Sequence, residues 1–250
     1  MKEQTHFFVQ KENEGCVEVY VLAPGIRISF NQIDTGSWPK GDSSFFPERM
    51  LTLNFCIGGR CDVSLAQNRY AIVKEQQVCV STIRPTKDFY YPGKHYYGIQ
   101  FYLDLSELER CGGQDFLTLL GIPLCQLRDT FCSADGLYLH HMNDAMLSLV
   151  QDIWAGREEL DFGQLRYFMV RLLHELLTMP SESEPDAYFT RSQIAIVREA
   201  EALILSDLSK RVTAREMAER FGISESSFKF YVKGILGESY LAYFRRKRME

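Results

Sequence analysis

Short runs of alternating apolar and polar residues fill the chain between residues 17 and 103. Glycine, proline and asparagine separate these runs, in pairs such as Pro24-Gly25 and Gly58-Gly59. Many short β-rich runs with turn signals between them are typical of a sandwich or barrel of the jelly-roll kind. We therefore expect strands at residues 17–22, 26–33, 51–57, 62–65, 70–73, 78–82, 89–91 and 96–103.

After this β-rich region the apolar residues recur every three or four positions, which is the spacing of helices. Short helices are expected at residues 105–111 and 115–120, and longer ones at 137–155 and 162–179. The apolar stripe of the helix at 137–155 comprises Tyr138, Met142, Ala145, Met146, Leu149 and Ile153. Such a stripe packs either on the barrel or against a second copy of the chain. We take this helix as the candidate homodimer contact, with an intramolecular core as the alternative.

A polar segment that contains two prolines follows, with Pro180 and then the sequence SESEPD. Segments of this composition commonly connect domains. We predict one domain at residues 1–180, a linker at 181–190 and a second domain at 191–250. A helix at 193–206 begins the second domain.

The segment 212–236 has the pattern of two short amphipathic helices joined by a tight turn. Thr213 and Glu216 form a capping box, which begins a helix by satisfying free backbone N–H groups. Gly222 ends that helix where we expect a positive φ, and Ser224 is a natural N-cap for the second helix. This is the helix-turn-helix pattern, whose second helix enters the major groove of DNA.

Charge is divided unevenly along the chain. The net charge is −5, but residues 187–250 hold 12 Lys+Arg against 8 Asp+Glu, a net of +4, and residues 1–186 carry the remaining −9. An acidic body with a basic C-terminal portion suits a sensor joined to a nucleic-acid-binding module.

Nothing in the sequence indicates export or a membrane. No apolar run approaches the roughly 20 residues that span a bilayer, and the N-terminus lacks the apolar core of a signal peptide. The seven cysteines contain no C-x-x-C pair, which fits free thiols in a reducing compartment. We therefore expect a cytoplasmic protein, associated with the nucleoid when it binds DNA.

The residues around and after the second helix resemble the AraC/XylS family of bacterial transcription regulators, over about residues 194–250. The matching residues are Ala218, Phe221, Gly222, Ser224, Gly237, Ser239, Tyr240, Tyr243, Phe244 and Arg248. The resemblance implies an α+β chain: an N-terminal cupin-like β-barrel followed by helices, which binds a small-molecule effector and dimerises, and then an all-α DNA-binding domain. It also implies a second helix-turn-helix unit after a linker helix. Because the sequence stops at Glu250, inside that helix, we expect a truncated chain with weak, strongly salt-dependent affinity for DNA.

On the second helix, the residues expected to face double-stranded DNA are Glu225, Ser226, Ser227, Lys229, Phe230 and Lys233. Lys229 is suited to guanine acceptors and Lys233 to phosphate. Phe230 contacts either a thymine methyl group or another part of the protein. Arg245 and Lys247, in the basic run of the linker helix, are weaker phosphate candidates.

The effector site is expected in the β-rich region. Arg27, Trp38, His95 and Tyr97 are the candidate pocket residues, because they combine aromatic and polar groups in the β-rich region. No cofactor and no metal site are expected: only one of the five histidines lies in that region, and His140 and His141 are expected on a helix surface. The alternatives are a ligand-free dimerisation or interaction module joined to a DNA-binding unit, and a cupin-type enzyme. The sequence names neither the effector nor the operator.

Overall fold

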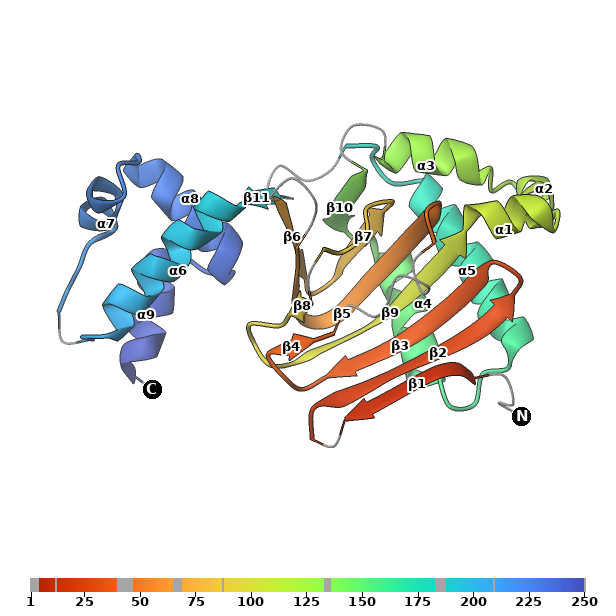
Figure 1. Cartoon of the computed structure of the whole chain (residues 1–250), viewed down its shortest axis with the longest axis horizontal. Coiled ribbons are helices and arrows are strands. Elements are labelled where there is room, and N and C mark those ends of the chain that lie inside the picture. The colour runs from red at the N-terminus through yellow and green to blue at the C-terminus, as the bar shows by residue number, and fades with distance from the viewer. Residues whose placement is uncertain are drawn as a thin grey trace. The chain divides into compact units, whose positions relative to one another are not determined.

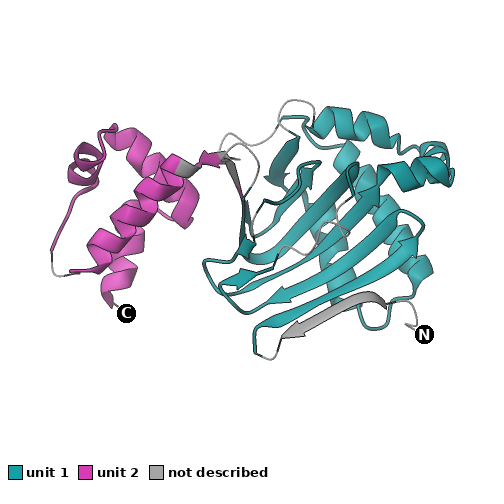
Figure 2. Cartoon of the chain, viewed as in Figure 1, with its two compact units in different colours: residues 1–66, 73–187 teal, residues 67–72, 188–250 magenta. Residues whose placement is uncertain are grey.

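The computed structural model describes residues 5–11, 13–39, 47–64, 69–86, 88–132, 136–182, 188–208 and 210–249. The chain divides into two compact units (Figure 2). The β unit comprises residues 1–66 and 73–187, and the helical unit comprises residues 67–72 and 188–250. Residues 183–187, half of the predicted linker, lie outside the described residues. The grouping of residues 67–72 with the helical unit was not predicted.

The β unit is built on an antiparallel sheet (Figure 1). The strands of the chain are β1 (Thr5–Lys11), β2 (Gly15–Ala23), β3 (Ile26–Ile33), β4 (Ser37–Trp38), β5 (Met50–Ser64), β6 (Arg69–Lys74), β7 (Gln77–Ser81), β8 (Phe89–Tyr90), β9 (Tyr96–Asp104), β10 (Leu137–His141) and β11 (Tyr188–Thr190). The order is β1-β2-β3-β9-β5, with β7 beside β5 and β10 beside β7. The predicted order of a β-rich region, then helices, then an all-helical part is confirmed.

Strand β5 joins what we expected to be two separate strands. Its register against β9 shifts between Cys56 and Gly58, and Gly59 has a φ of 83°, which only glycine adopts without strain. The strand therefore continues through the glycine pair instead of turning back. Its far half pairs with β8, where Asp62 lies opposite Tyr90, and β8 pairs in turn with β4.

Helices cover one face of the sheet. The helices of the β unit are α1 (Leu105–Arg110), α2 (Gly113–Leu119), α3 (Leu124–Cys132), α4 (Asp144–Ala155) and α5 (Phe162–Leu177). Ile28 of β3 and Phe101 of β9 belong to one buried cluster with Met146 of α4 and Leu173 of α5. The ring of Trp154 lies 6.3 Å from that of Phe30. This core fixes which residues of each strand point toward the helices.

The opposite face of the sheet carries polar side chains that are nevertheless buried. Ser29 is fully buried, and its hydroxyl lies 3.3 Å from that of Tyr102. Buried Tyr96 donates a hydrogen bond of 2.7 Å to Asn54. Buried polar groups are stable only when they are hydrogen-bonded. These two hydrogen-bonded pairs therefore explain why polar side chains can be buried on this face.

The helix expected at residues 137–155 is wrong in its first third. Leu137 to His141 form strand β10, whose backbone pairs with β7, and α4 begins only after the N-cap Asn143. The local spacing of apolar residues is helical there, but pairing with β7 supplies hydrogen bonds that decide the outcome. The predicted dimer stripe is wrong as well, because Tyr138, Met146 and Ile153 are buried in the core of the same chain.

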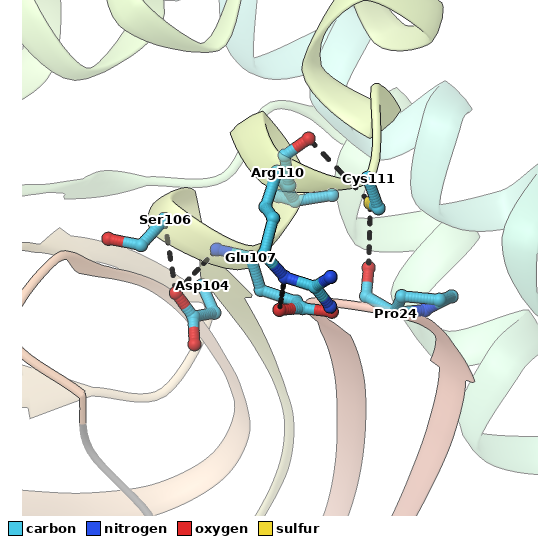
Figure 3. A network of polar contacts seen from close by, with 7 residues as sticks. Pro24, Asp104, Ser106, Glu107, Arg110 and Cys111 are labelled. Atoms are coloured by element: carbon cyan, nitrogen blue, oxygen red, sulfur yellow. Dashed lines mark hydrogen bonds and ion pairs between the residues drawn. The ribbon is translucent and has the colours of Figure 1, made fainter.

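Helix α1 begins directly where β9 ends (Figure 3). The Asp104 carboxylate accepts hydrogen bonds from the backbone N–H groups of Ser106 and Glu107, both at 3.1 Å. Arg110 pairs with Glu107 at 2.6 Å one turn later. The cap therefore sets the change from strand to helix at residue 104, as predicted. The ion pair is exposed and adds little to stability, because solvent screens charges at the surface.

The helical unit contains α6 (Arg191–Leu205), α7 (Ala214–Arg220), α8 (Glu225–Leu236) and α9 (Tyr240–Met249). The short strand β11 pairs with residues 69–71 of β6. Its Phe189 is buried and belongs to the core of this unit, together with Val197, Phe228 and Phe244. No helix among the described residues is long and apolar enough to cross a membrane.

Candidate nucleic-acid interface

Helices α7 and α8 have the capped, glycine-turned geometry that the sequence predicts. The Thr213 hydroxyl accepts from the Glu216 N–H at 3.2 Å, and the Glu216 carboxylate accepts from the Thr213 N–H at 2.7 Å. Gly222 has a φ of 66° in the turn. The Ser224 hydroxyl then caps α8 by accepting from the Ser227 N–H at 3.0 Å. The predicted capping box, turn and second cap are confirmed.

One face of α8 is buried in the helical unit. Phe228, Val232 and Ile235 are almost completely inaccessible, and the ring of Phe228 lies 5.6 Å from that of Tyr240. The opposite face leaves Ser226, Lys229, Phe230 and Lys233 exposed, whereas Glu225 and Ser227 are half-buried. A helix held by a packed face presents its remaining side chains at fixed positions, which is what a DNA-reading helix requires.

The outward residues of α8 fall into two sets. Glu225, Lys229 and Lys233 follow one another at spacings of four, and Glu225 pairs with Lys229 at 2.6 Å. Phe230 lies outside this row: its side chain is 44% exposed, and its ring lies 5.9 Å from that of Phe189. Part of the Phe230 ring is therefore occupied by intramolecular packing, and only the remainder is accessible to a partner.

The basic run on α9 serves partly as scaffold. Arg246 pairs with Glu238 at 2.7 Å, and its guanidinium lies 5.2 Å from the centre of the Tyr243 ring. Arg248 donates to the carbonyl oxygens of Leu208 and Lys210 at 3.0 and 2.9 Å. These two arginines hold the loop and the turn around α9. The candidates Arg245 and Lys247 alternate with them, Arg245 being exposed and Lys247 half-buried.

A pocket that the sequence did not predict lies between the start of α7, α8 and α9. Its volume is about 800 Å³. Four DNA candidates, Glu225, Lys229, Lys233 and Arg245, line it together with apolar Leu241 and Met249 of α9. The feature that marks it in the structure is a pair of large apolar side chains on the outer face of a basic helix: Leu241 is 62% and Met249 82% exposed.

Two tyrosines anchor α9 beneath these exposed residues. Burial raises the pKa of Tyr240 to about 12, and its hydroxyl donates to the Val212 carbonyl at 2.7 Å. Burial and a hydrogen bond to the Glu201 carboxylate raise the pKa of Tyr243. Both phenols therefore stay neutral donors at physiological pH, and their role is structural.

The structure does not bring the four effector candidates together. The side chain of Arg27 lies on the polar face of the sheet, near Tyr102, and burial lowers its pKa. Tyr97 lies on the opposite, helix-covered face, with its ring 5.4 Å from that of Trp154. Strand alternation separates the two, since neighbouring residues of β9 point to opposite faces. The residues that share the face of Arg27 and that sequence reasoning missed are Ser29, Asn54, Tyr96 and Tyr102.

Of the remaining two effector candidates, His95 lies beside Tyr97, with their rings 5.4 Å apart. His95 is exposed, and its Nδ1 lies 3.1 Å from an Asp34 carboxylate oxygen. Trp38 is buried on the two-residue strand β4, opposite Phe89.

The histidine pair expected on a helix surface lies on strand β10 instead. His140 is half-buried, with its ring 6.0 Å from that of Tyr138, and His141 is exposed. The described parts of the chain contain no cluster of three or more His, Cys, Asp or Glu side chains that is suited to a metal ion.

Comparison with known proteins gives structural likenesses only. No protein-family model matches the chain, and no curated protein matches it. Among solved structures, the AraC-like transcriptional activator CuxR is 9% identical, with 94% of this chain and 79% of that chain covered and a TM-score of 0.41. ToxT from Vibrio cholerae is 7% identical, with coverages of 88% and 79% and a TM-score of 0.38.

A second structure of ToxT, with an unsaturated fatty acid bound, is 8% identical over 94% of this chain and 79% of that chain, with a TM-score of 0.38. Of these, CuxR is described as AraC-like. At identities and TM-scores this low, the likenesses assign no function to this chain.

Proposed function

We propose that the chain is a sequence-specific DNA-binding regulator of transcription, with α8 as the helix that enters the major groove. The observation that supports it most is the capped pair α7 and α8, which turns at Gly222 and exposes one face of α8 while the other is packed. The resemblance of residues 194–250 to the AraC/XylS family points the same way. The proposal assigns no reaction to the chain and places it in the cytoplasm, where chromosomal DNA lies.

In this proposal the N-terminal half of α8 reads bases. Ser226 and Lys229 are one helical turn apart on its exposed side, within reach of base edges. Lys233 and Arg245 provide positive charge for phosphates, which position a protein on DNA without reading sequence. Glu225 keeps Lys229 extended along the helix through their ion pair, and the pair has to open when Lys229 donates to a guanine.

Selection from a random duplex pool, followed by anisotropy titrations, tests this proposal. Lys229→Ala is expected to lower affinity for the preferred duplex by about 1–3 kcal/mol and to relax the preference at one base pair. Arg171→Ala, which removes an exposed cation of the β unit, is the matched control and leaves both quantities unchanged. A loss that is equal on every duplex would make Lys229 a phosphate contact and refute its role as a reader.

We further propose that the β unit senses a small molecule on the polar face of its sheet. Arg27 supplies a positive charge there, and Ser29, Asn54, Tyr96 and Tyr102 supply hydroxyl and amide groups. A homodimer also remains a proposal, with a contact surface other than the apolar stripe of α4. Sedimentation of the purified chain, with and without candidate ligands, measures the oligomeric state.

A further inference from the structure

The pocket of the helical unit has an apolar floor and walls. Val212 and buried Phe244 line it, as do the exposed side chains of Leu241 and Met249. Exposed apolar side chains are ordinary when they are scattered over a surface. Here two of them border the same pocket, whose volume is about 800 Å³. The pocket therefore offers a partner more apolar contact than a purely DNA-facing surface needs.

The charged residues around the same pocket are almost all cations. Arg211, Lys229, Lys233, Arg245 and Arg248 line it, and among the residues that the structure describes Glu225 is its one acidic lining residue. Lys229 offsets the Glu225 charge at 2.6 Å. Arg248 is bonded to neutral carbonyl oxygens, so its charge is retained. An excess of positive charge thus borders an apolar hollow.

Size and charge together select the kind of occupant. Small-molecule sites occupy about 300–1,000 Å³ and are mostly apolar, with a few polar groups that fix orientation. DNA presents phosphates and sugars to a surface beside the major groove, and these do not fill an apolar hollow. We infer that the pocket binds an amphipathic organic anion, with its apolar body against Leu241, Phe244 and Met249 and its acid group among Lys229, Lys233 and Arg245.

Binding of this anion has a consequence for DNA recognition. Lys229, Lys233 and Arg245 are the cations that the proposed function directs at bases and phosphates, and one group cannot serve both partners fully. An occupant with a negative charge also repels phosphates. The anion therefore acts as an inhibitor of DNA binding. This consequence rests on the proposed function, whereas the binding of the anion itself does not.

Calorimetric titration of the full chain with decanoate, below its micellar concentration, tests the site without DNA. Saturable binding is expected, and 1-decanol should bind at least about tenfold more weakly because it lacks the charge. Arg245→Ala should weaken decanoate about tenfold, and Leu241→Gln should weaken decanoate and decanol alike. Arg171→Ala, the control outside the pocket, should change neither. Equal binding of decanoate and decanol, or loss in the control alone, would overturn the inference.

A second experiment separates this inference from the proposed function. DNA affinity is measured first without decanoate, and then with decanoate at saturation, where at least a tenfold loss is expected. If DNA binds and decanoate neither binds nor competes, the inference is wrong and the proposed function stands. If decanoate binds to the pocket and no DNA binds under any condition, the proposed function is wrong and the anion site stands.

Discussion

The contact between Phe189 and Gly234 gives a sharp test of how α8 is held. Phe189 lies on strand β11, and its ring is buried against α8 at the position of Gly234. A Cβ atom added at Gly234 would lie 2.1 Å from Cζ of this ring and 2.8 Å from Cε2. The rings of Phe230 and Tyr231 lie 5.9 and 6.5 Å from that of Phe189. They leave the Phe189 ring little room to move away from an added methyl group.

The magnitude follows from two opposing effects of Gly234→Ala. Alanine favours the helix over glycine by about 0.5–1 kcal/mol. Overpacking a filled core costs about 1–3 kcal/mol, and the 2.1 Å approach places this site toward the upper end. We therefore expect a net loss of about 1–2 kcal/mol in the free energy of unfolding of the helical unit. The direction is opposite to that of an ordinary glycine-to-alanine change in a helix.

Urea unfolding followed by helix circular dichroism measures this loss, with the helical unit fitted as its own transition. The matched variant is Phe189→Leu, which removes the ring atoms that meet the new methyl group. In that background Gly234→Ala should be neutral or stabilising, so the two changes are strongly non-additive. A Gly234→Ala protein as stable as the parent, or a penalty that persists in the Phe189→Leu background, would refute the reasoning.

Three further changes test other parts of the account. Thr213→Ala removes the cap of α7 and should lower the stability of the helical unit by about 1 kcal/mol in urea titrations; no change would mean that the capping box is dispensable. Met142→Lys places a charge at a position that is 8% exposed, so it should destabilise the β unit in thermal scans; a folded variant whose only defect is a smaller sedimenting mass would restore this segment to a dimer contact. Burial raises the pKa of the Cys79 thiol to about 12, whereas Cys111 is exposed. Maleimide at neutral pH should therefore label Cys111 before Cys79, as followed by mass spectrometry. The reverse order would contradict the burial of Cys79.

The helix-turn-helix elements were predictable because their signals are local. Thr213, Glu216, Gly222 and Ser224 act on groups within a few residues of themselves, so their spacing in the sequence fixes the caps and the turn. The same holds for the change from strand to helix at Asp104.

Features that depend on distant partners were missed. The segment 137–141 has a helical pattern, but its backbone pairs with β7, some sixty residues earlier. Arg27 and Tyr97 appeared equivalent as pocket residues until the register of β3 and β9 placed them on opposite faces. The pocket beside α8 required the packing of three helices, which no single stretch of sequence specifies.

In the proposed function, α8 lies against the bases of bound DNA. A photoreactive benzoylphenylalanine in place of Ser226, an exposed residue of the first turn of α8, tests this contact directly. On the duplex preferred by the parent protein, we expect this residue to cross-link to bases at one defined position. The same group in place of Tyr167, which is 60% exposed on α5 of the β unit, should not do so. Tight binding with no cross-link from residue 226 to any base would contradict the assignment of α8 as the reading helix.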